Sequence, residues 1–167
     1  MIFELKPLTQ EAIPKALEKA ERYRLLKEPA QAESICLDVL QIDPGNQQAL
    51  VMLLLALTDQ FEQGMAGTVT QAREVLTRLT DEYARLYYAG IIAERRAGAR
   101  LQHGGRGSEF VAYEWLREAM TWYERAEAIR PAGNDDALLR WNTCARILTR
   151  NPHLQRGPED HSEPPLE

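Results

Sequence analysis

The sequence predicts an all-α fold of about seven helices, joined as antiparallel pairs by short turns. The chain has 167 residues, of which 44% are hydrophobic and 27% are charged, which is ordinary for a globular domain with a sizeable core. Ala, Leu, Glu, Arg and Gln are frequent, whereas Val, Ile, Thr and Phe are few, and this balance favours helix over strand. Apolar residues recur at spacings of three and four, as on one face of a helix.

Two distant stretches share one pattern, and this recurrence organises the prediction. Each has Ala, then a mid-sized apolar residue, a small apolar residue, Ile and finally Pro, all at the same spacings. The residues are Ala32, Cys36, Val39, Ile42 and Pro44 in one stretch, and Ala119, Tyr123, Ala126, Ile129 and Pro131 in the other. Proline cannot continue a helix, so each stretch predicts an amphipathic helix that stops. A pattern that recurs within one chain indicates a repeat.

The helices are placed by their start and stop residues. Pro14 either bends the first helix or marks its true start, Pro29 suits the first position of the second, and Asn46 is a good N-cap for the third. The Gly-rich turn at 103–107 separates two long helices. The expected helices are 10–27, 30–42, 47–62, 68–79, 81–102, 108–130 and 135–150.

The domain organisation follows from a change of composition at each end. Residues 1–9 precede the first helical pattern and form an N-terminal arm. Residues 10–151 form the helical repeat domain. Residues 152–167 contain several prolines and acids with almost nothing apolar, which predicts a disordered acidic tail.

Helix pairs in which the second helix closes with Pro resemble the tetratricopeptide repeat (TPR) family, whose hairpin has roughly 34 residues. The second-helix pattern is matched by the two stretches above and in part by Ala72, Leu76 and Leu79. The first-helix pattern is matched more loosely by Ala16, Ala20 and Tyr23, by Leu50, Leu53, Leu54 and Leu57, by Leu86, Ala89, Gly90 and Ala93, and by Leu138, Trp141 and Ala145. The resemblance implies about three hairpins and a C-terminal capping helix in a right-handed α-solenoid.

One departure from the family pattern concerns the third hairpin. Between Ala93 and Ala119 lie 25 residues, where the family has about eight. Helices on both sides of the Gly-rich turn can absorb the surplus by growing. We therefore expect an extended third hairpin.

The resemblance also implies a function, which is binding of another protein in the concave groove lined by the first helix of each pair. Transferring that face to this chain selects Leu17, Glu21, Arg24, Val51, Leu55, Thr58, Tyr87, Ile91, Glu94, Leu139, Thr143 and Arg146. Its middle is apolar, which suits a peptide or helix segment. Leu17 and Glu21 stand where members that clamp acidic chaperone termini have Lys and Asn, so such a clamp is not expected. Alternatively these residues bury against residues 1–5 or against a second copy in a homodimer.

A second candidate surface is the basic tip of the third hairpin, formed by Arg95, Arg96, Arg100 and Arg106. The Gly-rich turn before a helix could cradle an anion, but it lacks the Lys-Ser/Thr of a P-loop and no strand precedes it. A plain hairpin turn with a solvated basic face is the alternative. Trp115 and Trp122, seven residues apart on one helix, either pack against neighbouring helices or present an aromatic platform to a partner.

The sequence carries no catalytic motif, so a non-enzymatic protein without cofactor is expected. His103, His153 and His161 are far apart, and no metal-ligand spacing or nucleophile motif is present. Cys36 and Cys144 lie inside helical patterns and are interpreted as buried thiols in a reducing compartment.

Charge and hydropathy limit the partners and the location. The net charge of −5 argues against general nucleic-acid binding. No apolar run is long enough to span a bilayer, and residues 1–10 lack the pattern of a signal peptide. A cytoplasmic location, with no membrane partner, is the resulting expectation.

Overall fold

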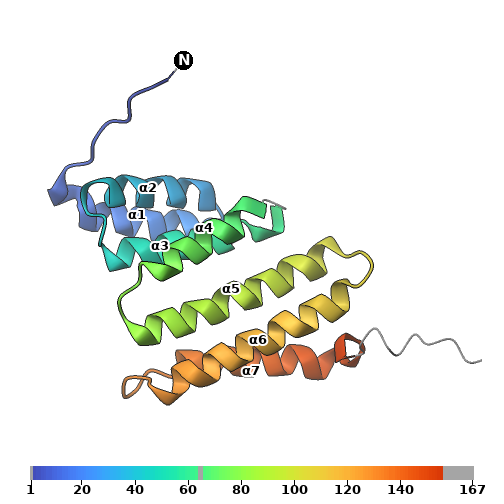
Figure 1. The fold of residues 1–167 in the computed structure, drawn as a ribbon. Helices are drawn as coiled ribbons and strands as arrows, with labels where there is room; N and C mark the ends of the chain where they lie inside the picture. The colour runs from blue at the N-terminus through green and yellow to red at the C-terminus, as the bar shows by residue number, and fades with distance from the viewer. Residues whose placement is uncertain (1, 64–65, 156–167) are drawn as a thin grey trace, which may run out of the picture. The chain divides into compact units, whose positions relative to one another are not determined.

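The computed structural model describes residues 2–63 and 66–155, and all regular secondary structure among them is helical (Figure 1). The prediction of an all-α fold with seven α-helices is therefore confirmed, whereas the handedness of a solenoid stays a prediction. The α-helices are α1 (Ile13–Leu25), α2 (Pro29–Ile42), α3 (Gln47–Thr58), α4 (Ala66–Thr77), α5 (Glu82–His103), α6 (Ser108–Ala128) and α7 (Asp136–Arg150). Three short 3₁₀ helices are η1 (Gln10–Ala12), η2 (Phe61–Gln63) and η3 (Pro152–Gln155).

The predicted start residues take the expected roles. Pro14 lies in the first turn of α1 and Pro29 in the first turn of α2, where a missing amide hydrogen is tolerated. The Asn46 side chain accepts the Ala49 amide hydrogen at 2.9 Å, and so it caps α3. The third helix is shorter than predicted, because α3 ends at Thr58. The following residues turn through η2, in which Phe61 is buried.

The third hairpin is extended, as its spacing predicted. Helices α5 and α6 have 22 and 21 residues, compared with 12 to 14 residues in α1 to α4. At 1.5 Å per residue each is about 32 Å long. The turn between them places Gly104, Gly105 and Gly107 at positive φ, which explains the glycines there.

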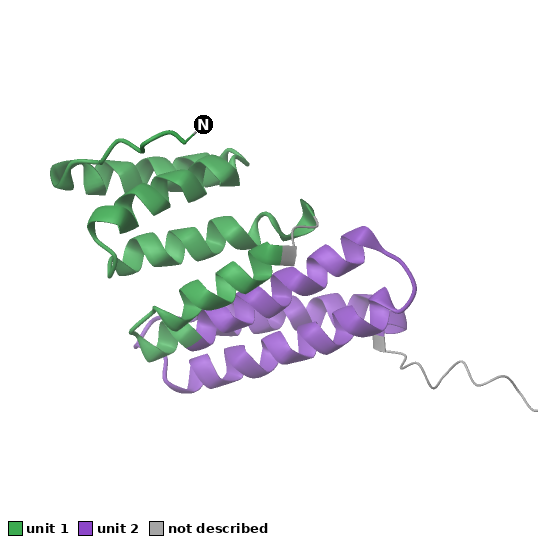
Figure 2. Ribbon diagram, turned by 45° about the horizontal axis from the view of Figure 1, so that its top comes forward, with its two compact units in different colours: residues 1–85 green, residues 86–167 purple. Residues whose placement is uncertain are grey.

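The contacts of the chain cluster into two units, residues 1–85 and 86–167 (Figure 2). In unit 1, α2 packs against both α1 and α3, and α3 also packs against α4. Small and apolar side chains at or near zero exposure fill this core, and they are Ala20, Ala32, Cys36, Val39, Leu50 and Leu54. Gln47 and Arg78 hold the ends of α3 and α4 together, since Gln47 accepts the Thr80 amide hydrogen at 2.9 Å and Arg78 donates to the Pro44 carbonyl at 2.9 Å.

In unit 2, α6 packs against α7 and η3, and Gly90 of α5 lies against Tyr123 of α6. A Cβ atom at position 90 would lie 2.7 Å from Cδ1 of the Tyr123 ring. Tyr123 is fully buried, so its ring occupies the space that a side chain on α5 would need. Both residues belong to the pattern on which the TPR resemblance rests.

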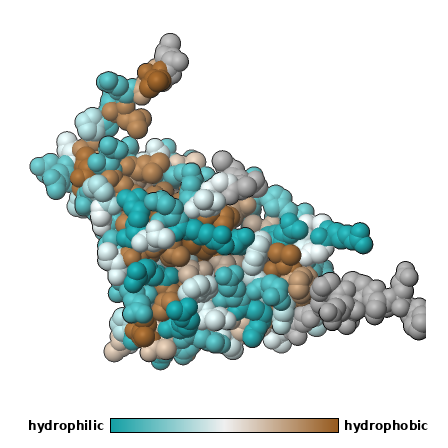
Figure 3. Space-filling model, viewed as in Figure 1, coloured by the Kyte–Doolittle hydropathy of each residue, from teal (hydrophilic) through white to brown (hydrophobic). Residues whose placement is uncertain are grey.

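The two ends of the chain differ from one another. Three apolar side chains of the N-terminal arm are exposed, at 97% for Ile2, 78% for Phe3 and 85% for Leu5. Figure 3 shows hydrophobic residues on the surface of this arm. These three side chains therefore do not cover the predicted groove. The alternative in which the groove residues bury against residues 1–5 does not hold for Ile2, Phe3 and Leu5. At the other end the predicted tail begins too early, because Pro152–Gln155 form η3 and bury Leu154. The remainder of the predicted disordered tail lies outside the described residues.

Candidate functional site

The predicted groove positions in unit 1 are partly buried. Leu17 and Thr58 have exposed fractions of 7% and 2%, and the Thr58 hydroxyl donates to the Leu55 carbonyl at 2.8 Å. Arg24 is half-buried because its Nε donates to Oδ2 of Asp59 at 2.6 Å. The structure corrects the predicted lining at Leu17 and Thr58, since both side chains belong to the core.

The side chains at the other three groove positions in unit 1 remain at least partly accessible to solvent. Glu21 is exposed on α1, whereas Val51 and Leu55 on α3 are half-buried. Apolar side chains on α3 point in most directions around the helix, which explains why some of them remain accessible after its core face is filled.

In unit 2 the structure corrects two further positions. Ile91 and Glu94 have exposed fractions of 1% and 9%. All five residues from Gly90 to Glu94 are buried, which is more than one turn of α5. The helical spacing predicted one exposed face here, but this part of α5 is covered around its whole circumference.

Glu94 instead forms a polar cluster that joins α5 to α7. Its Oε2 accepts from Arg140 at 2.9 Å, and its Oε1 accepts from the Cys144 thiol at 3.3 Å. The Arg140 side chain also donates a hydrogen bond to the Tyr87 hydroxyl. A buried carboxylate is tolerated here because it is both paired with a cation and hydrogen-bonded.

The cluster shifts the proton affinities of its members. Burial opposes the charge of Arg140, but the Glu94 carboxylate and the Tyr87 hydroxyl outweigh it and raise the pKa of Arg140. Burial, reinforced by Glu94, raises the pKa of the Cys144 thiol. Burial also raises the pKa of Tyr87. The thiol is consequently neutral and a poor nucleophile.

A surface hollow of about 290 Å³ lies beside this cluster. Its lining comes from α5 and α7 and consists of Tyr87, Asp136, Leu139, Arg140 and Thr143. Three of these five residues, Tyr87, Leu139 and Thr143, were predicted from the sequence as groove residues. Leu139 is the most accessible apolar contributor, with 59% of its surface exposed.

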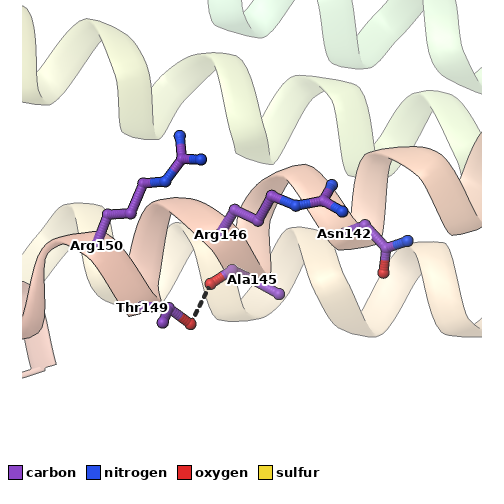
Figure 4. A pocket seen from close by; sticks show the side chains of 5 residues that line it. All are labelled: Asn142, Ala145, Arg146, Thr149 and Arg150. Atoms are coloured by element: carbon purple, nitrogen blue, oxygen red, sulfur yellow. Dashed lines mark hydrogen bonds between the residues drawn. The ribbon is translucent and has the colours of Figure 1, made fainter.

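A second hollow, of about 310 Å³, lies farther along α7 and is lined by Asn142, Ala145, Arg146, Thr149 and Arg150. Figure 4 shows the Arg146 and Arg150 side chains extending to the same side of the helix. The Thr149 hydroxyl is turned back and donates to the Ala145 carbonyl at 2.8 Å.

One exposed face of α7 runs from the first hollow to the second. Leu139, Thr143, Arg146 and Arg150 follow one another at spacings of four, three and four, so they form a single row, here called the α7 strip. All four side chains are exposed. Sequence reasoning found the first three members and missed Arg150, although the same spacing extended by one turn would have included it.

The residues of the predicted basic tip have different surroundings. Arg100 and Arg106 are exposed, whereas Arg95 and Arg96 are half-buried. The Arg96 guanidinium lies over the Trp115 ring, 4.1 Å from its centroid. The four arginines therefore do not form one solvated group, because this contact holds Arg96 against the Trp115 ring.

Aromatic residues of α6 and α7 make further polar contacts in unit 2. Arg125 lies 4.7 Å from the centroid of the Trp122 ring, and the Trp141 indole donates to Glu124 at 2.9 Å. Trp115, Trp122 and Trp141 are all half-buried. These rings therefore pack at helix edges and none is fully exposed.

Neither a metal-binding cluster nor a membrane-spanning helix is found among the described residues. No group of three or more His, Cys, Asp or Glu residues there is arranged to hold a metal ion. His153 lies 3.7 Å from Glu109, and His161 is outside the described residues. No described helix combines the length and apolar character that crossing a membrane requires.

Comparison with known proteins adds no relative on which this site could be mapped. No family model, no curated protein and no solved structure matches the chain. The resemblance to the TPR family therefore stays a prediction from the residues quoted above.

Proposed function

We propose that this chain is a non-catalytic interaction scaffold that binds a peptide or helix segment of a partner protein along the predicted groove face of unit 2. The α7 strip is the observation that carries the proposal. It presents an apolar side chain, a polar one and two cations in one row, beside two hollows of about 290 and 310 Å³. Side chains of a bound segment need such hollows as anchoring sites.

The test is site-specific crosslinking. A photoreactive residue placed at Thr143 should capture a partner, and Leu139→Asp should lower that capture about tenfold, because a carboxylate removes the apolar contact. Leu37→Asp is the matched control, since Leu37 is also an exposed helical leucine, at 51%, but lies on α2. Equal capture by the Leu139 and Leu37 variants would contradict the proposed surface.

Self-association is a second candidate function, and the N-terminal arm favours it. Ile2, Phe3 and Leu5 expose more than three quarters of their surfaces, and three large apolar side chains within four positions are a common feature of association segments. Light scattering over a wide range of concentration tests this. A concentration-dependent mass that becomes monomeric in Phe3→Ser/Leu5→Ser supports it, and a constant monomer mass contradicts it.

A further inference from the structure

The charge of the α7 strip is opposite to that of the chain as a whole. The chain has a net charge of −5, but the exposed charged side chains of the strip, Arg146 and Arg150, are both cations. Within α7 the only acid is Asp136, at the first position, and no acid follows it up to residue 155. Positive charge therefore accumulates toward the end of α7.

Two of the three arginines of α7 have no counter-charge among the side chains that the structure describes. Arg140 is neutralised by Glu94, 2.9 Å away. Arg146 and Arg150 form no ion pair with any other described side chain, and both are exposed in the second hollow. The helix dipole favours a cation in the last turn, which accounts for Arg150, but its effect does not reach Arg146 one turn earlier.

The other end of the strip is apolar and slightly acidic. Leu139 is 59% exposed beside Tyr87, and the Asp136 carboxylate lines the same hollow. Seven helical positions separate Leu139 from Arg146, which is about 10 Å along the helix axis. One end of the strip thus selects an apolar side chain and the other end selects negative charge.

On the basis of the proposed function, we infer that the segment bound by the α7 strip is an acidic stretch of a partner protein with one apolar anchor. The anchor packs on Leu139 and Tyr87, and carboxylates of the segment pair with Arg146 and Arg150. An extended segment advances about 3.3 Å per residue, so about three residues separate the anchor from the first carboxylate. Asp136 sets the direction, because it repels carboxylates from the end where the anchor lies.

A phosphate backbone fits this surface less well. Nucleic acids carry charge at every nucleotide, so a strand along the strip would bring phosphates past Asp136. It would also leave Leu139 without an apolar partner. The acidic polypeptide matches both ends of the strip at once.

The test uses a fluorescein-labelled synthetic peptide with one Leu followed, three positions later, by a run of Glu, together with the same peptide carrying Gln for Glu. Fluorescence anisotropy with the full chain should show the Glu peptide binding at least about tenfold more tightly. Arg146→Gln/Arg150→Gln should weaken Glu-peptide binding at least about fivefold, and added salt should do the same, since exposed ion pairs are screened.

The control variant Arg22→Gln/Arg73→Gln removes two exposed helical arginines of unit 1 and should leave the affinity unchanged. Equal affinity for both peptides, or no loss in the Arg146/Arg150 variant, would overturn the acidic preference while leaving the proposed surface intact. No effect of Leu139→Asp on either peptide would instead count against the proposed surface itself. Tighter binding of a labelled single-stranded oligonucleotide, lost in the Arg146/Arg150 variant, would also overturn the inference.

Discussion

At the scale of single residues, Gly90 decides how closely α5 and α6 approach. The position has no room for a Cβ atom, because the buried Tyr123 ring lies against the backbone there. Gly98, two turns along the same helix, is exposed, and a Cβ atom there would have nothing within 4 Å apart from the adjacent residues and backbone of its own helix. The same residue type therefore has a packing role at one position and none at the other.

Alanine substitutions at these two glycines should change stability in opposite directions. Gly90→Ala should lower the free energy of unfolding by about 2 kcal/mol, since overpacking outweighs the gain in helix propensity. Gly98→Ala should raise it by up to about 1 kcal/mol. Urea unfolding followed by circular dichroism measures both values. A Gly90→Ala variant as stable as Gly98→Ala would show that the Tyr123 ring can move aside.

The buried thiols should make stability fall at alkaline pH. Burial raises the pKa of Cys36 from 9.0 to about 12, and burial with Glu94 raises that of Cys144. In the unfolded chain both thiols ionise near pH 9.0, so their contribution is complete below that pH and is lost as the pH rises above it. From one pH unit below to one pH unit above the unfolded-state pKa of 9.0, the two thiols should together lower the free energy of unfolding by about 2–3 kcal/mol.

The measurement is urea unfolding of the wild type and of Cys36→Ala/Cys144→Ala across this pH range. The variant starts at lower stability because it loses core volume, so the slopes are compared and not the absolute values. Identical slopes would contradict the assignment of the alkaline loss to the thiols.

At the scale of elements, the Glu94–Arg140 pair connects the middle of α5 to α7. The side chains are 10% and 33% exposed, and the carboxylate also accepts from Cys144. By contrast, the Arg130–Glu127 pair at the end of α6 spans 3.3 Å with both side chains about one-third exposed. The position of α7, and with it the candidate surface, therefore depends on the buried pair.

Removing both members of the buried pair should destabilise the protein by less than the sum of the two single removals. Glu94→Gln and Arg140→Met should each cost about 2–3 kcal/mol, because each leaves the remaining charged side chain without its opposite charge. The double variant should cost less than the sum, with a coupling energy of about 1–3 kcal/mol. Arg130→Gln, the surface control, should cost less than about 0.5 kcal/mol. Strict additivity in a double-mutant cycle would refute the coupling.

At the scale of the whole molecule, the contacts fall into two units, and this organisation has a spectroscopic consequence. Trp115, Trp122 and Trp141 are the three tryptophans of the chain, and all belong to unit 2. Tryptophan fluorescence therefore follows unit 2 alone, whereas far-ultraviolet circular dichroism follows the helices of both units.

We expect the two signals to give different urea midpoints, because units with separate contact clusters need not unfold in one step. The comparison requires one protein sample and both detectors at identical urea concentrations. Coincident curves would show that residues 1–155 unfold as one cooperative unit.

Much of this organisation is determined locally and could be predicted from the sequence. Pro29 and Asn46 begin helices through their own backbone and side-chain chemistry, and the spacing between Ala93 and Ala119 predicted the length of α5 and α6. The resemblance to the TPR family placed Tyr87, Leu139 and Thr143 on one surface, and they share a hollow. Such features depend on residues within a few positions of each other, or on the recurrence of a pattern.

Only the tertiary structure decided which faces stay open. Ile91 and Glu94 had the spacing of groove residues, but α5 is buried around its full circumference there, and a helical pattern does not report how many neighbours a helix acquires. The partners of Glu94 lie 46 and 50 positions away, and Leu154 is buried by a 3₁₀ turn that composition assigned to the tail. The sequence by itself therefore determined the helices and their turns, whereas packing between distant segments determined the surface that remains for a partner.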